Sequence, residues 1–293
     1  MIEAQPFSIA LRGTLLVVAL AVFLWIECRR PLRKVTQPKF RRVMVNLGIA
    51  AVGALALRLV FFPIVLFTSD WTAQTRFGIL PLLELPAAVE IVIAILALDY
   101  TLYIWHWMNH KIPFLWRFHN AHHVDLDLDV STASRFHFGE LILSTGFRSG
   151  QVVLFGINPF VLILFETLIT TSAQFHHSNI RLPFRFEKIL NRIVVTPRMH
   201  GIHHSIVRDE TDSNFSTIFS FWDHLHRSIR LNIPQQAITI GVAAFRDPKE
   251  LGFLRTLLLP FGKSRAWRLS DGSVPGRESL REVRTTPPGR LVE

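Results

Sequence analysis

Apolar residues gather into three long runs within the first hundred residues of the chain. They cover residues 14–26, residues 43–68 and residues 78–98. A helix needs roughly 20 mostly apolar residues to cross the hydrocarbon of a bilayer. Each run therefore predicts a membrane-spanning helix, the first extended back to Ser8 if Arg12 reaches toward the headgroups.

The first run resembles a signal peptide in position and length. No small-residue cleavage site follows it, and Glu27, Cys28, Arg29 and Arg30 come directly after it. We therefore expect a retained signal anchor rather than a cleaved leader.

A strongly basic loop separates the first two runs. Its seven cationic residues are Arg29, Arg30, Arg33, Lys34, Lys39, Arg41 and Arg42. The positive-inside rule predicts that such a loop lies in the cytoplasm. The second run then exits, the third returns, and the chain should re-enter the cytoplasm near Asp99.

A fourth apolar region, residues 138–173, is interrupted by Gly156-Ile157-Asn158-Pro159. Gly, Asn and Pro so close together predict a turn. The two flanking stretches, about 15 to 18 residues each, would be about 22 to 27 Å long as helices. We expect a membrane hairpin with Asn158 at its tip, and with Arg148 and Glu166 facing the interior or a polar cavity because a charge is costly against lipid.

Composition agrees with a membrane protein. Of the 293 residues 49% are hydrophobic, and the mean hydropathy is +0.32. The net charge of +10 favours anionic lipid headgroups, and no zinc-finger pattern or stacking platform points to nucleic acid. The lone Cys28 excludes an intrachain disulfide and a cysteine-based metal site.

Histidines are the most distinctive polar feature. Of 13 in the chain, eight lie in two short stretches: His106, His110, His119, His122, His123, His200, His203 and His204. Residues three or four apart share a helix face, so each stretch can direct several imidazoles at one point.

Such an arrangement predicts an all-nitrogen metal site. Neutral imidazole suits zinc, copper, iron and nickel alike, and no thiolate is available to select among them. The alternative is a set of ordinary interfacial histidines. That alternative would require many separate hydrogen-bond partners near a bilayer, so we prefer the metal site.

The motifs resemble those of the sterol desaturase and fatty acid hydroxylase superfamily of membrane di-iron oxygenases. The resemblance covers roughly residues 90–262. It begins at Asp99 and Tyr103, and only eight residues separate His110 from the second histidine cluster at His119. Acyl-chain desaturases of the stearoyl type separate these clusters much further, so the short gap favours the hydroxylase branch.

Later segments extend the resemblance. The matching residues are Ser131, Thr132, Arg135, His137, Glu140, His177, Ser178, Asn179, Thr196 to His200, His203, His204, Glu210, Thr211, Asp212, Asn214, Trp222 and Asp223. The chain departs from the family at His224-Leu225-His226-Arg227-Ser228, where Leu-Phe-Gly-Thr is usual, which puts any role of that element in doubt.

The resemblance implies two iron ions, with dioxygen as co-substrate, and nine ligands. These are the eight clustered histidines together with His177, whose alternative is a membrane-surface position. Of the adjacent residues His176 and His177, His176 is the weaker candidate ligand.

Three further residues are candidates to orient a ligating imidazole. His137 and Glu140 lie three apart, and ligating histidines commonly donate to a carboxylate. The alternative for Glu140 is a surface salt bridge. Asp99 shares a helix face with His106 and could hold an imidazole or be solvated at the membrane boundary. Asp125, Asp127 and Asp129 alternate with apolar residues, which predicts an extended segment with its acids in water.

We expect an all-α integral membrane bundle with a helical cytoplasmic cap that carries the dimetal site. Residues 1–98 would form the N-terminal spans and basic loop, residues 99–262 a hydroxylase-like domain that includes the hairpin, and residues 263–293 a flexible basic tail. The implied activity is hydroxylation or desaturation of a lipid-like substrate, with electrons from a separate donor protein because no redox module is fused to the chain.

Two other functions remain open at this point. A membrane metal transporter would place histidines and carboxylates inside its spans, whereas only Glu84, Glu90 and Glu166 lie within the apolar runs. A catalytically inactive lipid-binding relative would not need every ligand position. We therefore prefer the oxygenase.

Overall fold

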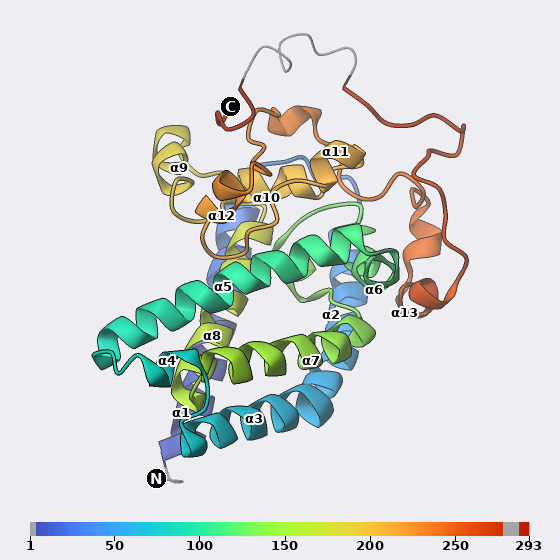
Figure 1. The fold of residues 1–293 in the computed structure, drawn as a ribbon. Coiled ribbons are helices and arrows are strands. Elements are labelled where there is room, and N and C mark those ends of the chain that lie inside the picture. Colours follow the sequence, from blue (N-terminus) through green and yellow to red (C-terminus); the bar gives the residue numbers. More distant parts are fainter. Residues whose placement is uncertain (1–3, 278–286, 293) are drawn as a thin grey trace.

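A computed structural model describes residues 4–277 and 287–292 of the chain. Within this part the chain forms helices joined by loops and no β-strand, only three isolated β-bridges. The prediction of an all-α fold is therefore confirmed. Figure 1 shows most of the long helices in the lower part of the molecule, with the short helices of residues 184–225 above them, next to the C-terminus.

The long helices correspond to the apolar regions of the sequence. They are α1 (Ala4–Arg29), α2 (Lys39–Ala56), α3 (Phe62–Thr75), α5 (Ala87–Lys111), α7 (Phe138–Phe155) and α8 (Pro159–His177). The shorter α-helices are α4 (Ile79–Leu82), α6 (Pro113–His123), α9 (Phe184–Leu190), α10 (Pro197–His203), α11 (Arg208–Thr211), α12 (Phe221–Leu225) and α13 (Phe253–Leu258). One π-helical turn, η1 (Leu57–Phe61), and the 3-10 helices η2 (Val130–Ser134), η3 (Gln235–Ala237), η4 (Pro248–Leu251) and η5 (Leu259–Phe261) complete the set.

The second apolar run is a bent helix rather than one straight span. The π-helical turn η1 joins α2 to α3, with Pro63 in the first turn of α3. The chain changes direction there (Figure 1), as expected where a π-bulge and a proline interrupt the regular hydrogen bonds.

The third apolar run is interrupted rather than continuous. It forms α4, then a break in which Glu84 has a φ of 47°, and then the start of α5. Because α5 continues to Lys111, His106 and His110 lie inside a long helix and one turn apart on one face.

The predicted helical pair of residues 138–173 is present as α7 and α8. Gly156 ends α7 in the left-handed conformation, and the Asn158 side chain accepts from Val161 N to cap α8. The turn packs against the loop after α3 so closely that a Cβ on Gly78 would lie 2.2 Å from Gly156 N. Only glycine is compatible with both the positive φ and this contact at residue 78.

The two arms do not lie back to back. In Figure 1, α7 runs across the view whereas α8 rises toward α10. Arg148 of α7 and Glu166 of α8 form an ion pair of 3.0 Å between the arms. Both line a cavity, as expected for charges in an apolar region.

Many large apolar side chains on the long helices are exposed. Val17, Leu59, Phe67 and Val92 are between 56% and 75% exposed. Two helical stretches among the described residues, Lys39–Leu82 and Ala87–Lys111, are long and apolar enough to cross a membrane. An exposed apolar surface of this extent is typical of a protein that contacts lipid.

Described parts of the predicted tail pack against the short helices. Trp267 Nε1 donates to the carbonyl of Ile206, and Arg277 forms an ion pair of 2.7 Å with Glu210. Leu291 is 6% exposed. These parts are therefore docked rather than flexible, whereas residues 278–286 and 293 lie outside the described residues.

Candidate metal centre

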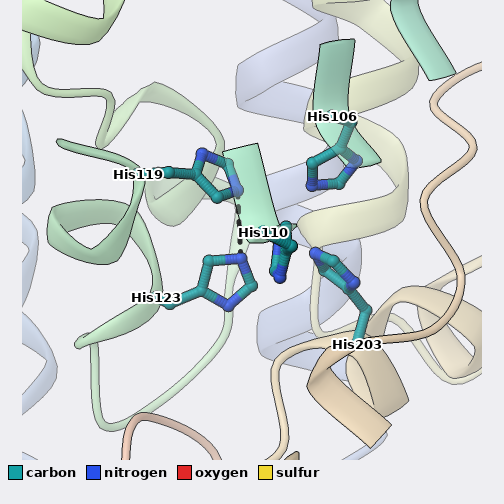
Figure 2. A group of neighbouring side chains, drawn as sticks. All are labelled: His106, His110, His119, His123 and His203. Carbon is teal, nitrogen blue, oxygen red and sulfur yellow. Dashed lines mark hydrogen bonds between the residues drawn. The ribbon is translucent and has the colours of Figure 1, made fainter. Parts of the chain in front are cut away.

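Five histidines form a first group, whose ligand atoms lie within 4.8 Å of one another. They come from α5 (His106, His110), α6 (His119, His123) and α10 (His203). Figure 2 shows their rings turned toward a common point. Helical spacing explains the pairs, because residues i and i+4 face the same side.

Four histidines form a second group within the same 4.8 Å limit. They are His122 of α6, His177 at the end of α8, and His200 and His204 of the α10 segment. The groups adjoin, since the rings of His123 and His204 stack with centroids 4.3 Å apart. The structure thus brings together all nine histidines that the family resemblance names as ligands.

Hydrogen bonds to main-chain carbonyls fix the orientation of three of these rings. In each case the ring Nδ1 donates to a main-chain carbonyl at 2.7 to 2.8 Å: His106 to Phe215, His177 to Ala173 and His203 to Ser213. A carbonyl can only accept, so Nδ1 carries the proton and Nε2 presents its lone pair to the group. This is how metal-ligating imidazoles are usually held.

The Nε2 atoms crowd together without enough protons to pair them. His177 Nε2 lies 3.0 Å from His122 Nε2 and 2.9 Å from His200 Nε2. Burial lowers the pKa of His203 to about 3 and keeps the pKa of His123 and of His204 well below the ordinary value. Neutral, buried imidazoles with converging lone pairs are the donor set that a transition metal requires.

Glu140 of α7 lies beside the first group. His119 Nδ1 donates to its Oε1 at 2.9 Å, and the residue is 5% exposed. Its Oε2 has no hydrogen-bond partner among the described residues. Glu140 is therefore a buried carboxylate that orients a candidate ligand, not a surface salt bridge.

The expectation that Asp99 holds an imidazole is wrong. Its carboxylate accepts instead from the main-chain N–H groups of Ile218 and Phe219 and from Trp222 Nε1. Asp99 thus fixes the loop before α12. Asp99 can affect the histidine groups only through that loop.

The expectation for His137 is also wrong. The side chain caps α7 by accepting from Gly139 N, and its Nε2 donates to the carbonyl of Leu257. Both ring nitrogens are engaged by the main chain, so His137 holds no ligating imidazole. Its helical spacing from Glu140 was misleading because it lies before the first turn of α7.

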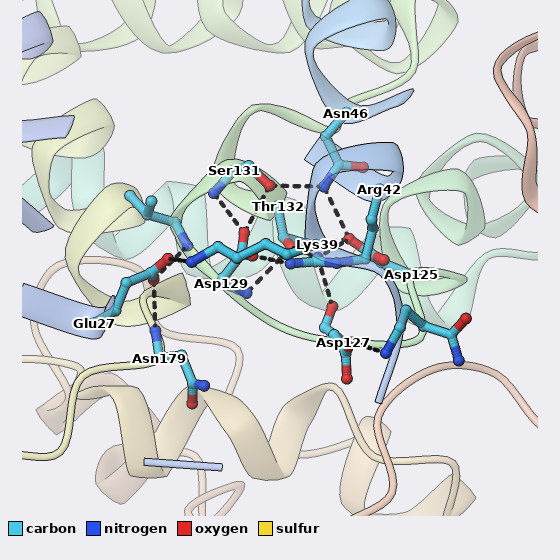
Figure 3. Close-up of polar contacts among 12 residues, drawn as sticks. Glu27, Lys39, Arg42, Asn46, Asp125, Asp127, Asp129, Ser131, Thr132 and Asn179 are labelled. Atoms are coloured by element: carbon cyan, nitrogen blue, oxygen red, sulfur yellow. Dashed lines mark hydrogen bonds and ion pairs between the residues drawn. The ribbon is translucent and has the colours of Figure 1, made fainter. Parts of the chain in front are cut away.

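Asp125, Asp127 and Asp129 do not face water. They are 3%, 7% and 3% exposed, in a network with the loop and helix that follow α1 (Figure 3). Arg42 pairs with Asp125 at 2.8 Å and also with Asp129. The alternation marks a segment buried on both sides, whose acids meet cations from elsewhere in the chain.

This network ties the basic loop to the second histidine cluster. Asp127 accepts from the main-chain N–H groups of Thr36 and Gln37. Glu27 accepts from Val130 N and Asn179 N, each at 3.0 Å, and so links the end of α1 to the segments that follow His123 and His177 (Figure 3). Part of the loop's charge is therefore internal.

Asp223 matches the family pattern in the sequence, but its role in supporting a ligand from a distance was not predicted. Asp223 accepts from the N–H groups of Phe215 and Ser216, and so holds the carbonyl that receives the His106 proton. The Trp222-Asp223 dipeptide of the family resemblance was the available signal. His224 is exposed, and His226 stacks on Tyr103 with ring centroids 4.8 Å apart; neither belongs to a histidine group.

A cavity of about 460 Å³ opens onto both groups. It runs between α2, α5, α7 and α8 and is lined mainly by apolar side chains such as Leu57, Phe61 and Leu102. His106, His119 and His122 are among the residues at its metal end. His176 also lines it, with its ring 4.1 Å from that of His200.

A helical fold with two adjoining histidine groups at the end of a mostly apolar cavity defines a candidate metal-binding protein with room for a hydrophobic ligand. Comparison with known proteins is more specific. The model of the fatty acid hydroxylase family matches residues 91–228. This region is just under half of the chain, and the match supports the resemblance to the sterol desaturase and fatty acid hydroxylase superfamily.

Three relatives show the range of this similarity. Ornithine lipid hydroxylase OlsE of Rhizobium tropici is 30% identical over 61% of this chain and 52% of its own. Cholesterol 25-hydroxylase of Mus musculus is 26% identical over 66% of this chain and 63% of its own. Alkylglycerol monooxygenase of Homo sapiens is 28% identical over 45% of this chain and 28% of its own.

The match spans between about half and just under two thirds of the length of the first two relatives. None of the solved structures is significantly similar to the chain.

Proposed function

We propose that the protein is a membrane-bound di-iron oxygenase that hydroxylates or desaturates a lipid-like substrate. The observation that carries the proposal is the opening of a mostly apolar cavity onto two adjoining groups of buried, neutral histidines. The named relatives act on an ornithine lipid, cholesterol and alkylglycerols. A hydrophobic substrate is their common feature.

The donor set suits two metal ions. His106, His110, His119, His123 and His203 would hold one, and His122, His177, His200 and His204 the other. Imidazole does not by itself distinguish iron from zinc, so the choice of iron rests on the family. Bound iron would supply the activation of dioxygen needed to attack an unactivated C–H bond.

The protein's own residues would provide binding, orientation and exclusion of water. Apolar cavity walls desolvate the substrate and align one carbon with the histidine groups. Glu140 keeps the His119 proton on Nδ1 and the lone pair of Nε2 toward the metal. The loop held by Asp99 and Asp223 does the same for His106 through the Phe215 carbonyl.

The proposal includes a multi-pass membrane position with the metal centre on the cytoplasmic side. The basic loop after α1 supports that side by the positive-inside rule. Because oxygenation consumes two electrons that the substrate does not provide, a separate donor protein would dock there. Residues 99–262 would form the catalytic domain, with residues 1–98 as its membrane anchor.

The test is oxygen consumption by the purified protein in lipid, with iron bound and a chemical reductant supplied. We expect oxygen uptake that depends on iron and on reductant, together with a hydroxylated or desaturated lipid. A metal transporter would move ions across vesicles without consuming oxygen. A lipid-binding relative would bind lipid and leave it unchanged.

A further inference from the structure

Away from the histidines, the mostly apolar wall of the cavity carries a buried ion pair. Arg148 is 7% exposed, and its Nε lies 3.0 Å from Glu166 Oε1. Its Nη1 donates to Gln151 Oε1 at 2.6 Å, and the guanidinium lies over the Phe165 ring at 4.9 Å. Arg148, Gln151 and Glu166 all line the cavity. We call these three residues the polar end of the cavity.

The polar end lies away from the histidines along both arms. Arg148 is eight residues beyond Glu140 on α7, about 12 Å along the helix. Glu166 is eleven residues before His177 on α8, about 16 Å along that helix. Both helices therefore place the charged group at the end of the cavity opposite the histidines.

The ion pair keeps unused hydrogen-bonding capacity. Nε of Arg148 and Oε1 of Glu166 are buried and lie 3.0 Å apart, but neither atom has a hydrogen-bond partner among the described residues. A buried ion pair seldom adds stability, because desolvation offsets the attraction. Charges in an apolar region commonly mark a binding site. An open donor beside an open acceptor is therefore best explained by a ligand.

We propose that Arg148 and Glu166 bind the uncharged hydroxyl group of an amphiphilic lipid, with the apolar body of that lipid extending toward the histidine groups. A hydroxyl can accept from the Arg148 guanidinium and donate to the Glu166 carboxylate at once. A carboxylate or phosphate would be repelled by Glu166, and an ammonium group by Arg148. The pair is neutral overall and so selects a neutral polar group.

The position of the oxidised carbon rests on the proposed function, whereas the binding of the hydroxyl group does not. If the oxygenase proposal holds, the oxidised carbon lies about 12 to 16 Å from the hydroxyl, as the helical rise requires. Sterols and long-chain alcohols both provide a hydroxyl and a body of about this length, and the cavity volume of about 460 Å³ is ordinary for such a ligand.

The experiment measures equilibrium binding of radiolabelled probes to the full chain in detergent micelles. One pair of probes is cholesterol and cholest-5-ene, which lacks the hydroxyl, and the other is 1-tetradecanol and tetradecane. Each alcohol should bind about tenfold or more tightly than its hydrocarbon, as expected for a hydrogen bond to a charged group. The pair with the larger difference identifies the source of the hydroxyl.

Variants separate recognition from folding. Arg148→Met should remove the preference for the alcohol while leaving hydrocarbon binding within about twofold. Arg58→Met, at an exposed arginine of the π-helical turn, is the matched control and should change neither. Glu166→Gln leaves Arg148 without its neutralising partner, so tetradecanoate in its ionised form should bind more tightly than it does to the wild type.

Three results would overturn the inference. They are tighter wild-type binding of tetradecanoate than of tetradecanol, an equal loss of alcohol and hydrocarbon binding in Arg148→Met, and no gain for tetradecanoate in Glu166→Gln. The last variant decides alone if Arg148→Met does not fold. Binding without any oxygen uptake would refute the proposed function and leave this inference standing.

Discussion

At the residue scale, the distinction that matters is between histidines with converging lone pairs and histidines placed elsewhere. His123 and His204 stack on one another at the junction of the two groups. His224 and His226 lie on α12 or at its end, and His226 contacts Tyr100 and Tyr103 instead. Each of these four histidines has another histidine within four residues along the chain, but only His123 and His204 are directed at the candidate metal site.

We expect His123→Ala and His204→Ala each to abolish oxidation, while His224→Ala and His226→Ala retain most of it. Losing a ligand should cost at least roughly 10-fold to 100-fold, because even changes in residues that support a ligand cost that much. The measurement is product formation by equal amounts of folded protein. Equal loss in all four variants would show that the boundary of the site is drawn wrongly.

Glu140 provides a second test at this scale. Glu140→Ala removes the acceptor of the His119 proton, so we expect metal affinity to fall about 10-fold to 100-fold while the helical content stays unchanged. Chelator titration followed by metal analysis measures this. Glu250→Ala is the matched control, because it alters only an exposed ion pair with Arg265 and should leave the metal affinity unchanged. Glu187→Ala is unsuitable as a control, because it breaks a buried ion pair with Arg198. A wild-type affinity in Glu140→Ala would contradict the role of Glu140.

At the scale of elements, the turn between α7 and α8 and the loop after α3 lie at the same end of the bundle. The Ser69 and Thr72 hydroxyls donate to the Ile157 carbonyl, and Gly78 contacts Gly156. Counting spans from the basic loop also predicts that these two segments share one side of the membrane. The contact agrees with the expectation that both segments lie on the same side of the membrane, and the positive-inside rule predicts that this side is opposite the cytoplasm.

Cysteine labelling tests this placement in a Cys28→Ser background, since Cys28 is exposed. Asn158 marks the tip but caps α8, so Phe160, which is 65% exposed, is the less disruptive position for the cysteine. We expect a membrane-impermeant reagent to label Phe160→Cys only from the outside, and Ala73→Cys, in exposed α3, likewise. Protection from both sides would indicate a re-entrant hairpin. Labelling from the cytoplasm would refute the topology.

The elements were predictable where one local pattern determined them. Gly156, Asn158 and Pro159 define the turn between α7 and α8, and helical spacing pairs His106 with His110. The bend at η1 and the break at Glu84 were not predictable from hydropathy, because an apolar run is equally apolar when bent.

Polar residues were mispredicted when their partners lay far away in the chain. Asp125 and Asp129 meet Arg42, more than eighty residues before them. Asp99 meets main-chain groups of residues 218 and 219. Spacing within a segment carries no information about such contacts, so the sequence indicated the ligand set but not its supports.

At the scale of the whole molecule, the helices bring a metal-binding chemistry and a lipid-sized space to one place. The second histidine cluster is held to the basic loop by Arg42, Asp125 and Glu27. His203 of α10 is held by the loop that follows this helix, and the cavity extends between the arms of the hairpin. The centre is thus assembled from segments distributed over most of the chain.

Metal analysis of protein purified without chelator tests this account most directly. We expect about two metal ions per chain, one for each histidine group. Where zinc has replaced iron during preparation, adding iron should restore oxygen consumption. Retention of about one ion after His204→Ala would further assign the second ion to its group. A fully folded preparation that contains no metal and still oxidises lipid would contradict the account.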